Sequence, residues 1–191
     1  ETADELELSD LAVLRREIAG EWYSNYLNNQ FSNGSVDSVI LVVKLIGTLG
    51  LDRYTSDVVQ QIYCHRKNPQ MQHIGFLSLC LLGAERPLVS ICRDASIASL
   101  LSFRTLEELF KVFRGDRKVL CRRLIDTAAD DYIRRTCVKA IGDNKYVTLA
   151  NRVLPLLESP KINMRIDATR TLGQLEYTPA YQSILALSRS D

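Results

Sequence analysis

The sequence predicts an all-α fold, a right-handed α-solenoid of about five helix pairs behind an N-terminal capping helix. Its 191 residues include only 9 glycines and 5 prolines, too few for the many turns of a β-sandwich or barrel. Apolar residues recur at spacings of three and four, the period of a helix with one buried face. Similar short segments recur about every 31 residues, a length typical of two-helix repeats.

Residues 1–34 are predicted to form an acidic segment and one long helix, separate from the repeats of residues 35–191. After the candidate capping residue Ser9, apolar and aromatic side chains share one helical face or lie beside it. These are Leu11, Leu14, Ile18, Trp22, Tyr23, Tyr26, Leu27 and Phe31. Such a stripe is typical of a helix that covers one end of a repeat stack, and a binding stripe is the alternative. Asn33-Gly34-Ser35 predicts the turn that follows.

Five helix pairs are expected after this turn. The predicted ranges are 36–48 with 54–66, 70–82 with 87–102, 104–113 with 117–128, 130–141 with 147–157, and 162–175 with 178–187. In the last pair, Ile162, Ile166 and Leu172 belong to one predicted apolar stripe. Thr178-Pro179 offers a cap and a first-turn proline to the second helix of that pair.

The last two pairs carry the clearest internal repeat. Arg165-Ile-Asp-Ala168-Thr-Arg-Thr-Leu172-Gly173 aligns with Arg134-Arg-Thr-Cys137-Val-Lys-Ala-Ile141-Gly142 at an offset of 31 residues, and Gly47 and Gly83 also follow aliphatic residues. The pattern Arg165-x-x-Ala168-x-x-x-Leu172-Gly173-x-Leu175 resembles the first helix and turn of HEAT-type repeats, particularly those of phycobilisome-lyase-like HEAT proteins. Small residues allow helices to approach closely, and we expect the glycines to end their helices in the left-handed region.

Cysteine usage indicates a reducing environment. The five cysteines are odd in number, scattered and without a C-x-x-C pair, which argues against a disulfide framework or a zinc clip. No apolar run is long enough to span a bilayer, and the first residues resemble no signal peptide. We therefore expect a soluble, cytoplasmic protein that does not associate with membranes.

Catalytic and cofactor motifs are missing from the sequence. The two histidines, His65 and His73, combine with Cys64 and Cys80 in no common zinc-ligand spacing. There is no G-x-S-x-G elbow, phosphate-binding loop or dinucleotide fingerprint. We therefore expect a protein that is not an enzyme and holds no metal or cofactor.

Charge is unevenly distributed along the chain. Residues 1–100 hold 8 basic and 12 acidic side chains, net −4, whereas residues 101–191 hold 16 basic and 11 acidic side chains, net +5. The predicted helix 117–128 is the second helix of its pair and contains four basic residues. We expect these to border the concave face of the stack, next to Arg152 of the following pair. The five candidate binding residues are Arg117, Lys118, Arg122, Arg123 and Arg152. A solvated surface with local ion pairs is the alternative.

These observations predict a scaffold or regulatory module that binds a protein partner or another part of its own polypeptide, with an acidic segment as the candidate ligand. Nucleic-acid binding through the basic C-terminal half is one alternative. Another is the sensor or regulatory repeat region of a larger signalling nucleotide hydrolase.

Overall fold

The computed structural model describes residues 21–101 and 103–187, and every regular element within these ranges is a helix. The α-helices are α2 (Glu21–Asn33), α3 (Val36–Leu49), α4 (Thr55–Cys64), α5 (Pro69–Leu81), α6 (Glu85–Arg93), α7 (Ala95–Ala98), α8 (Phe103–Val112), α9 (Arg117–Thr127), α10 (Asp131–Asp143), α11 (Ala150–Val153), α12 (Ile162–Gln174) and α13 (Tyr181–Leu187). Short 3-10 helices, η1 to η4, cover Asp52–Tyr54, Val147–Leu149, Leu154–Glu158 and Thr178–Ala180. The predicted all-α class is confirmed for this part of the chain.

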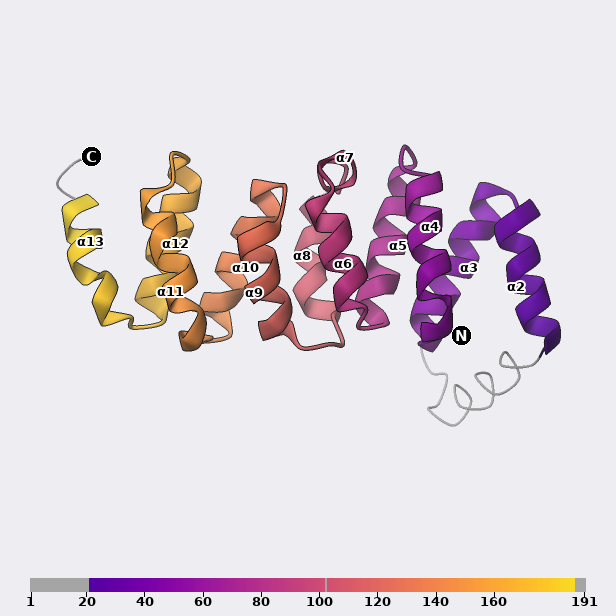
Figure 1. Cartoon of the computed structure of the whole chain (residues 1–191), viewed down its shortest axis with the longest axis horizontal. Helices are drawn as coiled ribbons and strands as arrows, with labels where there is room; N and C mark the ends of the chain where they lie inside the picture. Colours follow the sequence, from indigo (N-terminus) through magenta and orange to yellow (C-terminus); the bar gives the residue numbers. More distant parts are fainter. Residues whose placement is uncertain (1–20, 102, 188–191) are drawn as a thin grey trace, which may run out of the picture.

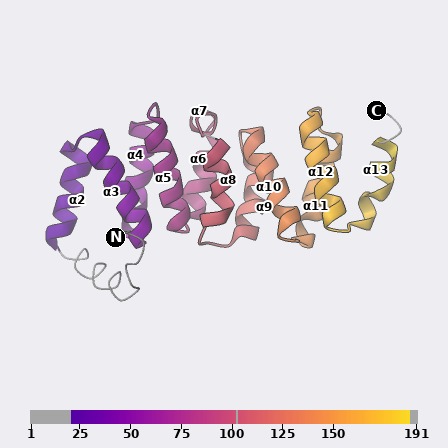
Figure 2. The same cartoon turned by 180° about the vertical axis from the view of Figure 1, so that it is seen from behind.

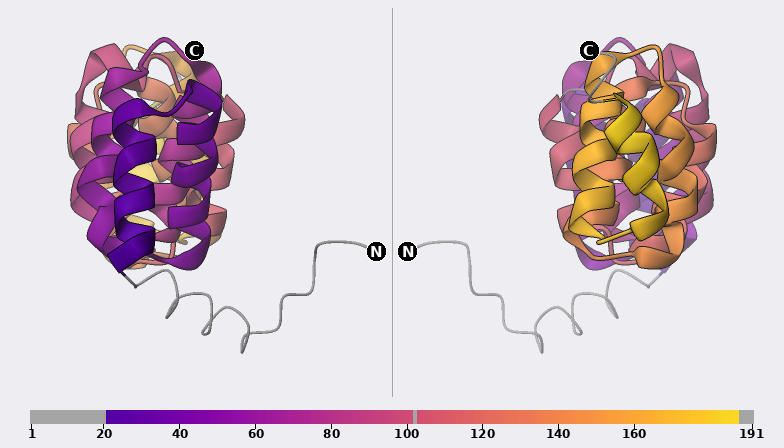
Figure 3. Two further views of the ribbon diagram at one scale, coloured as in Figure 1. Left: turned by 90° about the vertical axis from the view of Figure 1, so that its right-hand side faces the viewer. Right: turned by 90° about the vertical axis from the view of Figure 1, so that its left-hand side faces the viewer.

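The helices lie side by side in chain order along the long axis of the molecule (Figure 1). One layer consists of α3, α5, α8, α10 and α12, each of which contacts the next (Figure 2). The other layer consists of α4, α6, α9, α11 and α13, and the end-on views show the two layers facing each other (Figure 3). We call these the first and second layers. Within the described ranges, no helix combines the length and apolar composition needed to cross a bilayer.

Helix α2 packs against α3 at one end of the stack. Leu27 is fully buried and Phe31 packs against the core, whereas Tyr26 is half exposed. The rest of the predicted stripe, from Leu11 to Ile18, lies outside the described residues, as do the side chains of Trp22 and Tyr23. The turn predicted at Asn33-Gly34-Ser35 is confirmed, because α2 ends at Asn33 and Ser35 caps α3.

Most first-layer helices begin with the same kind of cap. Ser35 accepts a hydrogen bond from the backbone N–H of Ser38, and Asn68 accepts one from Met71. Asp130 plays the same role at the start of α10. A cap of this kind satisfies one of the N–H groups that a helix start leaves without a partner. A further aspartate, Asp94, caps α7, so the single helix predicted over 87–102 is instead two helices, α6 and α7.

Four first-layer helices end in the same hydrogen-bonded turn. The backbone N–H groups of Leu51, Ala84, Tyr146 and Tyr177 each donate to a carbonyl five residues earlier, on Ile46, Leu79, Ile141 and Leu172. The residue before each donor has a positive φ, as this helix-ending motif requires. These residues are Gly50, Gly83, Lys145 and Glu176.

The expectation that each repeat glycine ends its helix in the left-handed region is therefore wrong, except at Gly83. Gly47, Gly142 and Gly173 lie inside α3, α10 and α12, three residues before the positive-φ residue. The residue equivalent to Gly47 in the second pair is Cys80, which precedes Gly83 by the same three residues. In α3, α10 and α12 the aliphatic-glycine pair therefore lies in the last turn of the helix.

At Gly47 the missing side chain permits close packing. A Cβ atom there would lie 2.6 Å from the Cα and Cβ atoms of Ser78 on α5. The Ser78 hydroxyl donates to the Val43 carbonyl of α3 at 2.9 Å, in a buried position. Thr171 makes the equivalent hydrogen bond to Val138 between α12 and α10, at 3.0 Å. The same contact thus joins first-layer helices at both ends of the stack.

The apolar stripe predicted for α12 is partly wrong. Ile162 and Ile166 are 59% and 48% exposed, whereas Met164, Ala168 and Leu172 are buried. The predicted stripe of Ile162, Ile166, Thr169, Leu172 and Leu175 left out the polar and small side chains, such as Asp167 and Ala168, that α12 buries. The mainly polar sequence of this helix therefore concealed which face points into the core.

Candidate binding surface on the second layer

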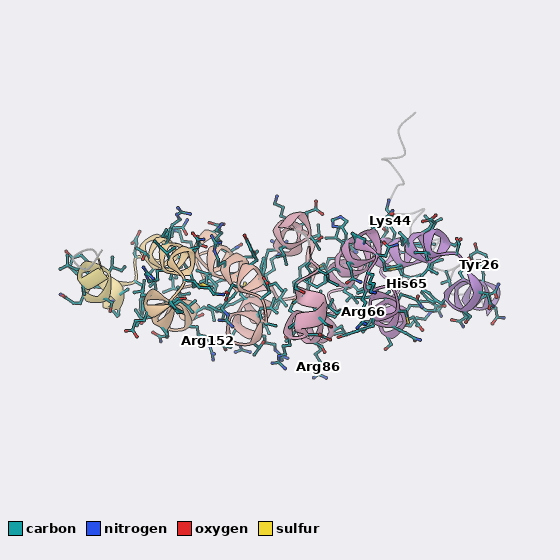
Figure 4. All side chains as sticks on the ribbon, turned by 90° about the horizontal axis from the view of Figure 1, so that it is seen from above. Tyr26, Lys44, His65, Arg66, Arg86 and Arg152 are labelled. Atoms are coloured by element: carbon teal, nitrogen blue, oxygen red, sulfur yellow. The ribbon has the colours of Figure 1, made fainter. Side chains whose placement is uncertain are left out.

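The predicted basic residues all lie in the second layer, on two neighbouring helices. Helix α9 carries four of them and α11 carries Arg152. Asp116 fixes the start of α9 because its carboxylate accepts a hydrogen bond from the Val119 N–H at 3.0 Å. Leu120, Cys121, Leu124 and Ile125 form the buried side of α9, so the intervening positions point outward. Arg152 projects from the outer side of this layer (Figure 4).

Three of the five residues, Lys118, Arg122 and Arg152, line one open depression of about 450 Å³. The remaining lining residues are Asp116, Val119, Thr148 and Leu149. Its walls therefore combine three basic side chains and one carboxylate with the apolar Val119 and the hydroxyl of Thr148, whereas Leu149 is buried beneath them. We call this depression the α9–α11 groove.

The other two predicted residues have structural partners away from the groove. Arg117 donates to the carbonyls of Phe113 and Lys111 at 3.4 and 3.2 Å, where α8 ends. The Arg123 Nε lies 2.7 Å from a carboxylate oxygen of Glu85 on α6. These two side chains stabilise the joins between helices, so the predicted set divides into a structural pair and a groove-lining triad.

The members of the triad differ in how far their charges are compensated. Arg152 forms an ion pair with Asp126 of α9. Lys118 and Arg122 are exposed and have no hydrogen-bonding or ionic partner among the described residues. The Asp116 carboxylate beside them is engaged in capping α9. The groove therefore presents two cations without a partner, beside a third that is paired and beside the Asp116 carboxylate, which keeps its negative charge.

Sequence reasoning missed a basic extension of this surface. Arg86 and Arg93 of α6 are exposed, and Arg86 projects on the same side as Arg152 (Figure 4). Contacts between α6 and α9 make these helices neighbours in the second layer. Charge counting overlooked the two arginines because they lie in the net acidic half of the chain, and only the stacking of helices brings them to α9.

A second depression, of about 760 Å³, lies where α4 is joined to α5. His65, Arg66 and Lys67 line it, together with the exposed Cys64. The Asp94 carboxylate has a pKa below its ordinary value because Ser96 donates hydrogen bonds to it, with smaller contributions from Tyr63 and Arg66. Part of the charge of Arg66 is thus balanced locally.

The histidines bind no common partner within the described part of the chain, and four of the five cysteines are buried. His73 shares a 2.7 Å hydrogen bond with Thr105 and lies on α5, away from His65. In the described ranges, no three His, Cys, Asp or Glu side chains are grouped so that they could hold a metal. Burial raises the pKa of the Cys121 thiol to about 12 despite the neighbouring arginines, and burial likewise raises that of Cys92 to about 12. Thiols of this kind are poor nucleophiles near neutral pH.

In comparisons with known proteins, no family model and no curated protein matches this chain. Function is therefore argued from the groove itself. Exposed guanidinium and ammonium groups beside an aliphatic surface can bind carboxylates or phosphates and, at the same time, an apolar side chain. They supply binding energy and orientation rather than bond-breaking chemistry.

Proposed function

We propose that this chain is a non-catalytic binding module that recognises an acidic protein segment through the α9–α11 groove. The observation that carries the proposal is the convergence of Lys118, Arg122 and Arg152 from two helices around Val119 and Leu149. Lys118 and Arg122 need no intramolecular bond to be broken before they bind an anion, because neither has a partner in the described part of the chain.

The architecture we propose is a HEAT-like, right-handed α-solenoid. The repeated caps, helix-ending turns and Ser78- and Thr171-type contacts support it, as does the two-layer row of helix pairs. Such stacks offer extended surfaces without deep pockets, which suits scaffold and regulatory roles. The five free cysteines support a cytoplasmic, reducing location.

An acidic protein segment fits the groove better than a nucleic acid does. Val119 and the exposed Val147 are aliphatic, so they offer an apolar side chain a contact but give bases no stacking platform. The charges are also few, whereas a dedicated nucleic-acid surface usually dominates the charge of its domain. Nucleic-acid binding is therefore the second candidate.

A fluorescent peptide of alternating glutamate and leucine tests the proposal. Titrated into the full chain at physiological salt, it should bind more tightly than a lysine-leucine peptide of equal length. Arg122→Glu should weaken binding at least tenfold. Lys139→Glu makes the same charge change at an exposed position on α10, in the first layer, and should leave binding within twofold.

The same titration with short duplex and single-stranded DNA and RNA separates the two candidates. We expect only weak binding. Its affinity should fall as the salt concentration rises, because the release of counterions on binding then becomes less favourable. Submicromolar nucleic-acid binding that Arg122→Glu abolishes would replace the acidic protein segment as the ligand. Equal binding of both peptides, or equal loss in the two glutamate variants, would refute a role for the groove.

A further inference from the structure

The basic surface of the second layer continues from the α9–α11 groove onto α6. Arg86 of α6 is exposed and projects on the same side as Arg152 (Figure 4). Together α6, α9 and α11 carry seven basic and two acidic side chains. The two carboxylates, Glu85 and Asp126, each face an arginine, and that of Asp116 caps the start of α9. Because cations exceed carboxylates here, this face favours a negatively charged ligand that reaches all three helices.

The conformation and charge spacing of that ligand follow from the arrangement of the cations. On the basis of the proposed function, we propose that the acidic protein segment crosses α6, α9 and α11 in the polyproline II conformation, with a carboxylate at every third residue. One carboxylate would pair with Arg86, the next with Lys118 and Arg122, and the third with Arg152. We call these four side chains the cationic row.

The starts of α6 and α9 lie beside each other, which brings Arg86 and Lys118 to the same height on the stack. Gly83 and Gly115 each stand two residues before the start of their helix, and a Cβ at Gly83 would lie 3.4 Å from the Gly115 nitrogen. Arg86 and Lys118 are each the second residue of the helix that follows. The groove continues the row from Lys118 to Arg152. The cationic row therefore runs across the helices, along the long axis of the molecule (Figure 1).

The distance between neighbouring helices sets the spacing of charge in the ligand. Packed helices lie about 8–10 Å apart. In a polyproline II segment every third residue falls on the same side, and three residues advance about 9 Å. In a β-strand, side chains on one side are two residues or about 7 Å apart, and the third residue points the other way. A carboxylate at every third residue of a polyproline II segment therefore matches one helix after another, whereas alternating carboxylates do not.

The cationic row is available to a ligand. Arg86, Lys118 and Arg122 have no hydrogen-bonding or ionic partner among the residues that the structure describes. Arg152 pairs with Asp126, but both side chains are about half exposed, and exposed ion pairs contribute little stability. The guanidinium of Arg152 can therefore bind a ligand carboxylate at little cost.

Two fluorescent peptides of equal composition, both blocked at their ends, test the spacing. Glu-Pro-Leu-Glu-Pro-Leu-Glu has glutamates three residues apart, and Pro-Glu-Leu-Glu-Leu-Glu-Pro has them two residues apart. Both are titrated into the full chain at about 50 mM salt, where exposed charges are weakly screened. The first peptide should bind at least fivefold more tightly than the second. Equal binding of the two, or tighter binding of the second, would overturn the inference.

Charge reversals test whether the ligand reaches α6. Arg86→Glu should weaken binding of the first peptide at least fivefold. Arg93→Glu makes the same change about 10 Å further along α6, and Arg170→Glu makes it at an exposed position of α12, in the first layer. Each of these two controls should weaken binding less than twofold. Equal losses in the Arg86 and Arg93 variants would overturn the inference, because the effect would then reflect only the charge of the helix.

A charge exchange tests the pairing at each end of the cationic row. Lysine replaces either the first or the last glutamate of the first peptide. The Arg86→Glu chain should bind one of these two peptides at least threefold more tightly than it binds the unaltered peptide. The Arg152→Glu chain should prefer the other one. Improvement with neither peptide would contradict the proposed pairing.

The Arg122→Glu variant separates this inference from the proposed function. If it weakens binding of both peptides while Arg86→Glu weakens neither, the ligand is confined to the groove, so the inference falls and the proposed function stands. If neither variant weakens binding, both fall. Tighter binding of a thymidine heptanucleotide, with the same dependence on Arg86 and Arg122, would overturn both in favour of a nucleic acid.

Discussion

Replacing glycines in the first layer by alanine should change stability in opposite directions. Gly173 lies inside α12, is exposed, and has no atom within 4 Å of the position that a Cβ would take. Because alanine is favoured over glycine in a helix by up to about 1 kcal/mol, Gly173→Ala should stabilise the protein by about 0.5–1 kcal/mol.

Gly47→Ala should be destabilising. Its Cβ would lie 2.6 Å from the Cα of Ser78, a backbone atom that can move only if α3 and α5 separate. Overpacking of this kind costs about 1–3 kcal/mol. The preference of alanine over glycine in a helix offsets less than about 1 kcal/mol of that cost. We expect a net loss of about 1–2 kcal/mol, and therefore a difference of about 2–3 kcal/mol between the two variants.

Urea unfolding at 25 °C, followed by circular dichroism at 222 nm, measures this difference. A repeat stack does not always unfold in one step, so unfolding midpoints are compared together with the slope of each transition. Gly142→Ala should fall between the other two variants, because its Cβ would meet mainly the flexible end of the Gln174 side chain. A destabilising Gly173→Ala or a neutral Gly47→Ala would refute the assigned roles of these glycines.

Four further outcomes follow from the buried contacts and the buried thiols. The Arg135 Nε lies 2.6 Å from the buried carboxylate of Asp167, so Arg135→Met should cost about 3 kcal/mol of unfolding free energy, because it leaves that charge unpaired. Ser78→Ala should cost about 1 kcal/mol through loss of the hydrogen bond to Val43; no change in the urea midpoint would contradict this. In the native chain, iodoacetamide at pH 8 should modify Cys64 rapidly and the other four cysteines only on unfolding, because those four are buried with raised pKa values. Since those thiols ionise in the unfolded state first, stability should fall as pH rises above about 9, and a pH-independent midpoint between pH 9 and 11 would contradict it.

The sequence predicted the helical class and the helix pairs because these depend on local patterns. Glycine and proline scarcity and apolar spacing act within a few residues of chain, although Thr178, predicted as a cap, lies inside η4 and makes no capping hydrogen bond. The turn at Asn33-Gly34-Ser35 was predicted for the same reason. Gly173 was wrongly expected to end its helix in the left-handed region. A glycine near a helix end can either adopt that conformation or lie in the last helical turn, and the sequence looks the same in both cases.

The candidate site was predicted only in part because it depends on which helices become neighbours. Lys118, Arg122 and Arg152 were identified, and the structure brings them to one groove. Arg123 pairs with Glu85, 38 positions away in the sequence, and no local pattern indicates such a contact.

The repeats are more regular in structure than in sequence. At one position of the first-layer helices, different residue types donate a similar hydrogen bond to a backbone carbonyl of the preceding segment. Arg134 and Arg165 each donate to a carbonyl six residues earlier, on Ala128 and Ser159. In the second pair, Gln72 stands seven residues before Leu79, as Arg134 stands before Ile141, and its amide donates to the Ile62 carbonyl at the end of α4 at 2.8 Å.

If this hydrogen bond matters more than the residue type, a glutamine at position 134 of α10 should preserve more of the stability than a residue without a donor. Arg134→Gln should cost less unfolding free energy than Arg134→Met, because it keeps an N–H donor on the side that faces the carbonyl of the buried Ala128. Arg134→Met has a side chain of about the length of glutamine but has no donor, so it should cost about 1–3 kcal/mol by leaving that carbonyl without a partner. Urea midpoints of the two variants, measured side by side, give the difference. Equal losses would mean that Arg134 stabilises the chain through its charge or its packing instead of through this hydrogen bond.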